Sequence, residues 1–335
     1  MPSSRITWRL RLFVRALLTI GILTSLAVAP AWGAEPRSFT FLPHWLPQAQ
    51  FAGYYMAHEK GLYRKRDVDV TILRGGPEHP PSETIARGRV DFASTFLSSA
   101  IELRSRGVRL VNIAQVVQRS GFTLVTKKAS GIKSPADLNG KKVGIWPEFR
   151  VQPQAFFRKY GLDVTPVHQG ATMNLFLRGG VAAASAMWYN EYHTLLNSGL
   201  NEDDLAPFFF DRHGLNFPED GIYCLEETYR RNPNLCRDFV QASFEGWEYA
   251  FTHPEETLDV VMRHIRKANV GTNRVHQKWM LARMKDLILP PGGDTIRGHL
   301  KREDYLRVAG EMKQSGLIKE IPPYGEMYAD CTGTR

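Results

Sequence analysis

Cysteine is scarce in this chain of 335 residues, which contains only Cys224, Cys236 and Cys331. Their spacing fits none of the paired patterns that hold structural zinc, so the sequence predicts no metal site. Three cysteines permit either one disulfide with one free thiol or three buried thiols, and the spacing does not distinguish these arrangements.

The familiar catalytic motifs are also missing. The chain has no G-x-S-x-G, no Walker A sequence and no G-x-G-x-x-G, and the pair His58 and Glu59 lacks the second histidine of H-E-x-x-H. Carboxylates are present, but no nucleophile is paired with one. We therefore predict no catalytic residues, no cofactor and no enzymatic activity.

The N-terminal apolar run is too short to span a bilayer. Four arginines and no acid precede a charge-free run of 16 residues, 16–31, whereas a spanning helix needs about 20 residues. The pattern favours a cleaved secretory signal over 1–34, cut after Gly33 or Ala34, over the alternative of a membrane anchor. We expect the mature protein in the periplasm.

Positive charge is concentrated in that predicted signal. Its removal lowers the net charge from +9 to about +5, because four of the 43 basic residues and none of the 34 acidic residues lie within it. The remaining basic clusters are short and are not interleaved with aromatic residues, so we expect no nucleic-acid partner.

Solenoid repeats and low-complexity tracts are absent, and strands alternate with helices instead. Strands are predicted at 39–43, 68–73, 90–93, 110–117, 123–126, 142–146, 164–167 and 182–187. Helices are predicted at 48–60, 82–88, 97–106, 152–160, 173–178 and 191–198, and in a tail at 235–252, 254–267, 275–287 and 302–315. The alternation indicates an α/β fold with mainly parallel sheets, and its restart near residue 125 indicates two lobes.

Aromatic and polar side chains gather where predicted strands end. In open α/β sheets a ligand lies beyond the carboxyl ends of the strands. Those ends carry Trp45 and Gln48, then Ser94, then Trp146 and Glu148, and finally Trp188, Tyr189, Asn190 and Glu191. Three tryptophans at such positions favour a planar, heteroaromatic ligand, which the indoles would stack on while the carboxylates and amides bind its edge.

Each of these residues also has a simpler interpretation. A single tryptophan is as often a core residue as a ligand contact. Glu148 or Glu191 alone can be a carboxylate that stabilises the N-terminus of a helix through the helix dipole. Tyr54 and Tyr55 lie in the first predicted helix, where one is expected to line the cleft and the other the core. Asp220, in Glu219-Asp220-Gly221, fits either a hinge between lobes or a ligand contact.

Three segments resemble one known family. They are similar to the solute-binding proteins that deliver thiamine-pyrimidine precursors to ABC importers. The segments are HWLPQAQFAGYYMAHEKGLYRKRDVDVTIL, then LNGKKVGIWPEFRVQPQAFFRKYGLD with AMWYNEYHTLLNSGLNEDDL, and finally ASFEGWEYAFTHPEETLDVVM. The resemblance covers residues 38–290 and implies a type II periplasmic-binding fold with two lobes, a two-stranded hinge and a helical C-terminal tail.

The resemblance also implies a domain division, partners and site residues. Residues 38–123 with 223–335 are expected to form one lobe and 124–222 the other, in a monomer that meets an ABC permease and ATPase. By position, Trp45 is expected to be the stacking ring, with Tyr54 or Tyr55, Glu148 and Glu191 as partners in the cleft.

His44 stands where the family has an aspartate, which leaves other ligands open. The first candidate is the pyrimidine precursor, followed by riboflavin or a related flat heterocycle, and then a sulfonate or nitrate anion. The same superfamily contains a fungal pyrimidine synthase, whose consumed histidine and pyridoxal-phosphate lysine would fall near Thr95 and Ser99. Neither residue matches, so the resemblance favours a binding protein.

Overall fold

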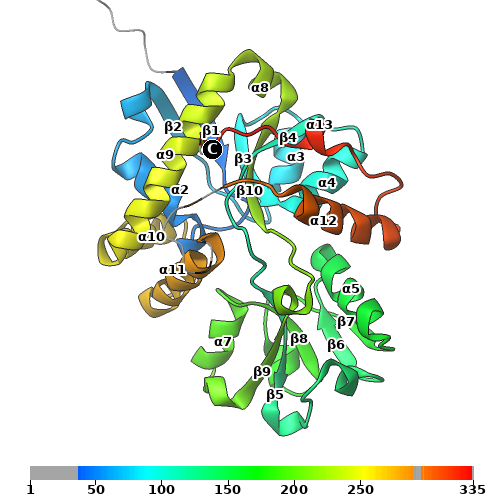
Figure 1. The fold of residues 1–335 in the computed structure, drawn as a ribbon. Coiled ribbons are helices and arrows are strands. Elements are labelled where there is room, and N and C mark those ends of the chain that lie inside the picture. Colours follow the sequence, from blue (N-terminus) through cyan, green and yellow to red (C-terminus); the bar gives the residue numbers. More distant parts are fainter. Residues whose placement is uncertain (1–36, 290, 292–295, 297, 334–335) are drawn as a thin grey trace, which may run out of the picture. The chain divides into compact units, whose positions relative to one another are not determined.

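The computed structural model describes residues 37–289, 291, 296 and 298–333. The predicted signal segment therefore lies outside the described residues. Two five-stranded sheets organise this part of the chain (Figure 1).

The first sheet has the strand order β2-β1-β3-β10-β4. Its strands are β1 (Arg37–Leu42), β2 (Val68–Ile72), β3 (Phe92–Phe96), β4 (Leu110–Gln115) and β10 (Asp220–Leu225). β1 runs parallel to β2 and β3, whereas β10 runs antiparallel to both of its neighbours.

The second sheet repeats this arrangement with the order β7-β6-β8-β5-β9. Its strands are β5 (Phe122–Lys127), β6 (Lys142–Ile145), β7 (Thr165–His168), β8 (Ala183–Met187) and β9 (Leu205–Phe209). Here β6 is parallel to β7 and β8, and β5 is antiparallel to β8 and β9.

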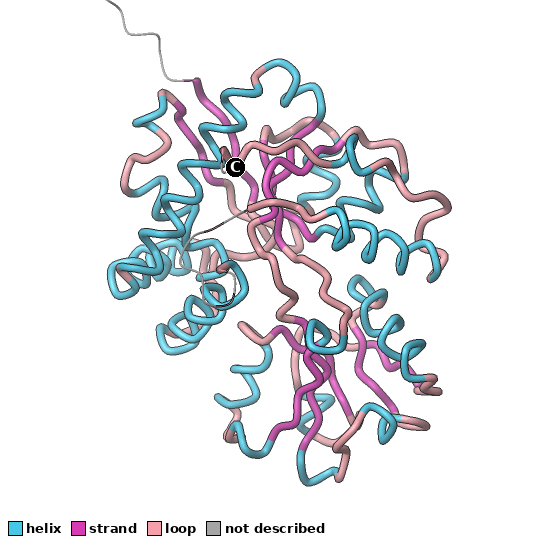
Figure 2. Tube along the Cα trace, viewed as in Figure 1, coloured by secondary structure: helices cyan, strands magenta, loops and turns pink. Residues whose placement is uncertain are grey.

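The chain crosses between the sheets twice. It passes from β4 to β5 and returns from β9 to β10, so that each sheet receives its antiparallel strand directly next to a crossing. Figure 2 shows both crossings as loop segments between the two sets of strands. The result is the predicted two-lobe α/β fold with mainly parallel sheets and a two-stranded hinge.

The sequence pattern predicts neither β9 nor β10, although the other strands lie close to their predicted positions. Pro207 has no backbone N–H to donate within β9. β10 begins with Asp220 and Gly221, residues that are uncommon in strands. Both strands are held by their neighbours rather than by their own propensity.

Short and long helices cover the sheets. The helices are α2 (Ala52–Glu59), α3 (Pro81–Ala86), α4 (Leu97–Ser105), α5 (Val151–Tyr160), α6 (Asn174–Leu177), α7 (Glu191–Asn197), α8 (Glu226–Arg231), α9 (Pro233–Thr252), α10 (Pro254–Lys267), α11 (Arg274–Ile288), α12 (Arg302–Gln314) and α13 (Tyr324–Met327). Single 3-10 turns are η1 (Ala49–Phe51), η2 (Arg64–Arg66), η3 (Lys128–Ser130), η4 (Pro135–Leu138), η5 (Pro147–Phe149), η6 (Glu202–Asp204) and η7 (Phe210–His213). Among the described residues, no helix is both long and apolar enough to cross a bilayer.

The tightest helix contact joins α2 to α9 in the first lobe. A Cβ added to Gly246 would lie 2.1 Å from the carbonyl oxygen of Gly53, so only glycine permits the two backbones to approach this closely. Trp247, next to this crossing, is one of the largest fully buried side chains. The tail helices therefore pack onto the first lobe as part of its core.

Candidate functional site

A cluster of polar side chains lies where the two lobes meet. We call it the central cluster, and its members are His44, Gln50, Ser94, Tyr189, Glu219 and Asp220. The topology explains this gathering, because β10 runs antiparallel to β3 and its first residue pairs with the last residue of β3. The start of β10 therefore lies at the carboxyl ends of the parallel strands, where ligands bind in such sheets.

Gln50 connects the two lobes within this cluster. Its Nε2 donates to Asp220 Oδ2 at 3.0 Å and to Tyr189 Oη at 3.2 Å. Gln50 and Asp220 belong to the first lobe, whereas Tyr189 follows β8 of the second. The cluster is thus completed only when both lobes are present.

Two buried carboxyl groups in the cluster each keep an oxygen without a hydrogen-bond partner. Glu219 Oε1 accepts from the backbone N–H of Gly121 at 2.6 Å, but Glu219 Oε2 is unpaired. Asp220 Oδ1 is also unpaired, with His44 Nδ1 3.5 Å away. An unsatisfied buried acceptor costs about 1–3 kcal/mol, so a ligand that donates N–H or O–H groups here would relieve that cost.

Burial changes the protonation of these groups. It raises the pKa of Glu219 to about 8, with a further contribution from the Asp220 carboxylate, and the pKa of Asp220 to about 7. Burial lowers the pKa of His44 to about 3. At neutral pH the imidazole is therefore uncharged and supplies no cation for an anionic ligand. Glu219 largely keeps its proton and Asp220 is divided between its two forms, so the two acids can both donate and accept hydrogen bonds.

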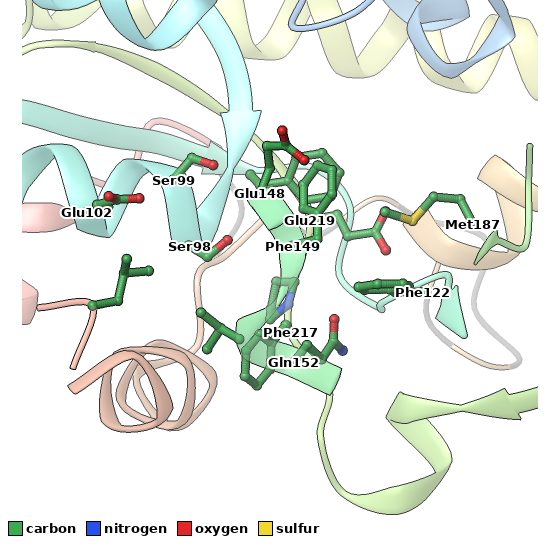
Figure 3. Close-up of a pocket in the computed structure, with 14 residues that line it drawn as sticks. Ser98, Ser99, Glu102, Phe122, Glu148, Phe149, Gln152, Met187, Phe217 and Glu219 are labelled. Carbon is green, nitrogen blue, oxygen red and sulfur yellow. The ribbon is translucent and has the colours of Figure 1, made fainter. Parts of the chain in front are cut away.

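A pocket with phenylalanine walls adjoins Glu219 (Figure 3). We call it the aromatic chamber, a narrow space of about 30 Å³ that is lined by Phe96, Phe122, Phe149, Met187, Phe217 and Glu219 among others. In Figure 3, Ser98 and Ser99 lie on one side and Phe122 and Met187 on the other. The rings of Phe96 and Phe149 pack on each other, with centroids 4.8 Å apart and planes tilted by 56°, and together they form an apolar wall of the chamber.

A second pocket opens between the lobes on a different set of residues. We call it the uncharged groove, which has a volume of about 270 Å³ and is lined by Trp45, Gln48, Asn190, Thr194, Asn197 and Asn273 among others. No Asp, Glu, Lys or Arg lines it. The groove is linked to the central cluster through Gln48, whose Nε2 donates to Gln50 Oε1 at 2.5 Å.

Helix α11 of the tail forms a contact with the second lobe. Trp279 Nε1 donates to the carbonyl oxygen of Trp188 at 2.9 Å, and the Trp279 ring stacks on His193 with centroids 4.9 Å apart. His193 Nδ1 and His276 Nδ1 lie 3.0 Å apart. These contacts hold the segment that carries Tyr189.

The structure brings several sequence-predicted site residues together. Ser94, Tyr189 and Asp220 lie in the central cluster, where Ser94 Oγ accepts from the backbone N–H of His44 at 3.0 Å. Three more line the uncharged groove, and one lines the aromatic chamber. These are Trp45, Gln48 and Asn190 in the groove, and Glu148 in the chamber.

Both tyrosines of the first helix are buried in contacts with other parts of the first lobe. Tyr55 stacks on His264 of α10 with centroids 4.0 Å apart, on the side of α2 that faces the tail. Tyr54 packs on Phe41 and Trp247, and its hydroxyl is buried without a hydrogen-bond partner. Burial raises the pKa of Tyr54, and the Asp220 carboxylate raises it further because Tyr54 is close enough to Asp220 to interact with its charge.

The rings of Trp146 and Trp188 pack on other side chains of the protein. Trp146 lies on Phe122 with centroids 5.6 Å apart, and its Nε1 donates to Gly170. The Trp188 ring contacts Phe209 and lies under the guanidinium of Arg283, 4.6 Å from the ring centroid.

Glu191 makes hydrogen bonds within its own segment. It accepts from the backbone N–H of Met187 at 3.0 Å and from Asn190 Nδ2 at 2.8 Å. This carboxylate therefore shapes the turn that leads from β8 into α7.

Sequence reasoning did not identify Gln50 or the phenylalanines of the chamber. Glu219 was a hinge or contact candidate, and the signal that separates it from a surface acid is its place directly before the buried run that forms β10. Gln50 has no distinctive signal of its own, because its role depends on Tyr189, 139 positions later. Among the described residues, no group of three or more His, Cys, Asp or Glu side chains could hold a metal ion.

Comparison with known proteins agrees with this architecture. The family model described as "NMT1/THI5 like" matches residues 48–257. The chain belongs to the NMT1/THI5-like family. Within solved structures, the periplasmic aliphatic sulphonate-binding protein SsuA of Escherichia coli has the same fold, with a TM-score of 0.68 and 15% identity over 87% of this chain and 91% of that one.

Relatives of this NMT1/THI5-like chain are named for different roles. A riboflavin-binding protein of Chloroflexus aurantiacus is 26% identical over 89% of this chain and 90% of its own length. A formylaminopyrimidine-binding protein of Halalkalibacterium halodurans is 25% identical over 67% of this chain and 70% of its own. A 4-amino-5-hydroxymethyl-2-methylpyrimidine phosphate synthase of Saccharomyces cerevisiae is 23% identical over 64% of this chain and 67% of its own.

Proposed function

We propose that this protein is the periplasmic solute-binding component of an ABC importer and that it binds a planar heteroaromatic ligand between its lobes. The observation that carries the proposal is the pair of buried, unpaired oxygens, Glu219 Oε2 and Asp220 Oδ1, at the meeting point of the lobes. The bound ligand would bridge the lobes beside the existing contact between Gln50 and Tyr189 and so stabilise the closed state. A permease and an ATPase would then receive the ligand.

The ring would lie against the phenylalanine walls of the aromatic chamber, and its polar edge would meet the two acids. The thiamine pyrimidine precursor is the first candidate, since an aminopyrimidine edge carries N–H donors and relatives are named for making or binding such pyrimidines. A flavin is the second candidate, favoured by the riboflavin-binding relative that matches nearly the whole chain. A sulfonate or nitrate anion is disfavoured, because two acids and a neutral His44 line the cluster.

A binding role agrees with the residues better than a synthase role does. Thr95, in buried β3, and Ser99, on the chamber wall, stand near the positions where the resemblance places the synthase histidine and lysine. Neither side chain can supply the chemistry of a histidine or a lysine. We accordingly propose a monomeric binding protein without a cofactor.

The proposed lobes are 38–123 with 223–335, and 124–222. β10 joins the first sheet from Asp220, so the second crossing ends three residues before the proposed boundary at 223. The predicted signal at 1–34 would be cleaved on export.

Thermal-shift screening against the pyrimidine precursor, thiamine, riboflavin and an alkanesulfonate tests the proposal. A true ligand at about 100 times its Kd should add about 2.7 kcal/mol of stability. Asp220→Asn and Glu219→Gln should each weaken binding by about 10- to 100-fold, because each replaces a carboxyl oxygen that would accept from the ligand with an amide NH2 group that cannot accept. Glu78→Gln, at an exposed acid, serves as the control. Stabilisation by the alkanesulfonate alone, or full affinity in both cluster variants, would overturn the proposal.

A further inference from the structure

The uncharged groove has the composition of a site for neutral hydroxyl groups. Its polar lining consists of amide and hydroxyl side chains together with His276, and burial lowers the pKa of His276 to about 4, so that this imidazole is neutral at pH 7. Amides and hydroxyls offer both donors and acceptors without a net charge. This combination matches the alternating donors and acceptors of a polyhydroxylated chain.

Parts of the groove wall are fixed by hydrogen bonds of their own. Gln277 Oε1 accepts from the backbone N–H of Ala49 at 2.7 Å, and Gln277 Nε2 donates to Thr272 Oγ1 at 3.0 Å. Asn273 Oδ1 caps α11 by accepting from the backbone N–H of His276 at 2.9 Å. The wall is therefore preorganised, which reduces the entropy that binding would cost.

Other polar groups of the groove are exposed and keep bonding capacity. Thr194 donates to the Asn190 carbonyl at 3.4 Å, which leaves its oxygen lone pairs available. Asn197 Nδ2 lies 3.2 Å from His193 Nδ1, and the amide oxygen of Asn197 is left as an acceptor. Asn273, having used Oδ1 as the cap, retains its amide N–H groups. Two acceptors and a donor therefore face one space.

An exposed indole completes the groove. The Trp45 side chain is 39% exposed, more than that of any other tryptophan among the described residues, and it stands at the edge of the groove next to Leu46. A flat apolar ring beside uncharged hydrogen-bonding groups suits the C–H face of a hydroxylated carbon chain.

The groove also adjoins the place where a ligand ring is proposed. Gln48 lines the groove and donates to Gln50, and Gln50 in turn donates to Asp220 of the central cluster. Gln48 and Gln50 thus stand between the cluster and the groove, and a substituent on a ring held at the cluster would enter the groove where these two side chains move aside. We propose that the uncharged groove binds a neutral, polyhydroxylated chain carried by the heteroaromatic ligand.

This inference rests on the proposed function and shifts the ligand preference toward ring compounds with an alditol side chain, such as riboflavin. A phosphate on that chain should add no affinity, because no Lys or Arg lines the groove to pair with it.

Three flavins with the same ring system test the inference. Lumiflavin carries no hydroxylated chain, riboflavin carries a neutral one and flavin mononucleotide carries a phosphorylated one. Titration followed by flavin fluorescence should show riboflavin binding about tenfold tighter than lumiflavin, as expected for two added hydrogen bonds. Flavin mononucleotide should bind no tighter than riboflavin.

Two groove variants and two matched controls locate the effect. In Trp45→Ala and in Asn197→Ala, the ratio of the lumiflavin Kd to the riboflavin Kd should fall toward one. The lumiflavin Kd itself should change by less than about twofold. The controls are Tyr160→Ala, at an aromatic side chain of similar exposure outside the groove, and Asn174→Ala, at an exposed asparagine of α6. Both should keep the wild-type preference.

The outcomes separate this inference from the proposed function. Equal binding of lumiflavin and riboflavin would overturn the groove assignment while a ring site remained. Binding of the pyrimidine precursor with no binding of any flavin would overturn it as well. Absence of binding by every heteroaromatic compound would overturn the proposed function itself.

Discussion

Two neighbouring acids, Glu219 and Asp220, distinguish the centre of this protein from an ordinary packed interface. Each is 3% exposed, and each keeps one oxygen without a hydrogen-bond partner. The residues around them supply amides and hydroxyls but no cation, since His44 is neutral at pH 7. Such a pair lowers stability in the ligand-free protein and gains most from a ligand with donors.

The raised pKa of Glu219 predicts a pH dependence of stability. The folded carboxyl keeps its proton up to about pH 8, whereas the unfolded one, with an ordinary pKa of 4.5, releases it much earlier. The folded state therefore binds more protons in this window, and the free energy of unfolding should fall as pH rises from 5 to 8. Denaturant unfolding of ligand-free protein at pH 5, 6.5 and 8 measures this slope.

Glu219→Gln should flatten that dependence. The amide cannot ionise, so we expect the variant to be more stable than the wild type at pH 8 by about 1–3 kcal/mol and to differ less at pH 5. Glu78→Gln, at an exposed acid, should leave the slope unchanged. An unchanged slope in Glu219→Gln would show that this carboxyl is ionised throughout the window.

At the scale of the elements, α11 joins the tail to the second lobe through a histidine pair. Asn190 Nδ2 donates to Glu191, so Asn190 Oδ1 is the acceptor for His276 Nε2 at 2.9 Å. Neutral His276 then presents an Nδ1 lone pair, and His193 donates its Nδ1–H to it. One added proton can go to His193 without breaking this hydrogen bond. A second, on His276 Nδ1, would place two N–H donors opposite each other.

Acid should therefore weaken the contact between α11 and α7. Burial lowers the pKa of His276 to about 4, with a further contribution from His193, whereas an unfolded histidine titrates near 6.5. The contribution to stability is present above pH 6.5 and is lost as pH falls toward 4.

His276→Gln should reduce the loss of stability between pH 7 and pH 4. Glutamine can still donate to Asn190 but takes up no proton, so the difference in denaturation midpoint between the two pH values should shrink. His58→Gln, at an exposed histidine on α2, is the matched control and should keep the wild-type difference. A variant that loses stability with acid as steeply as the wild type would contradict the role of the pair.

At the scale of the whole molecule, the two crossings give each sheet one strand next to the hinge. β5 leads into the second lobe and β10 returns to the first, so the central cluster is anchored at both crossings: Glu219 precedes β10 and accepts from Gly121, which precedes β5. A rotation of one lobe against the other would therefore change the cluster directly.

The three cysteines belong to the core of the first lobe. Cys224 lies in β10, Cys236 in α9 and Cys331 near the C-terminus, and all three are buried free thiols. The pKa of Cys224 is raised by a hydrogen bond with Cys236 and by burial, and burial raises the pKa of Cys331 to about 12. Buried thiols of this kind are poor nucleophiles.

A thiol reagent should therefore not label the native protein at pH 8. After unfolding in denaturant without reductant, we expect three reactive thiols per chain, counted by mass spectrometry of the alkylated protein. A single labelled thiol under those conditions would show that two of the cysteines form a disulfide.

Much of the fold could be predicted from local patterns. The alternating strands and helices, the restart near residue 125 and the helical tail follow from residue spacing, which depends only on neighbours along the chain. β9 and β10 could not be predicted this way, because Pro207 and Gly221 are poor strand residues that their partner strands hold in place.

The candidate site could be predicted only in outline. The rule that ligands lie at strand ends led to Ser94, Tyr189 and Asp220, which the structure assembles, and to Trp45, which lines the groove. The same rule led to Trp146 and Trp188, whose rings pack on Phe122 and Phe209 instead. A sequence shows that a side chain follows a strand but does not show its rotamer or its neighbours.

The sequence by itself determined the class of fold, the family resemblance and the ends of strands where a ligand would be sought, because these depend on periodicity and on short motifs. The tertiary structure alone decided that Gln50 meets Tyr189, that Glu219 and Asp220 are buried with unpaired oxygens, and that Trp45 faces an uncharged groove. Burial and pairing arise between residues more than a hundred positions apart. The charge state of the site follows from that burial, so it becomes visible only once the lobes are folded together.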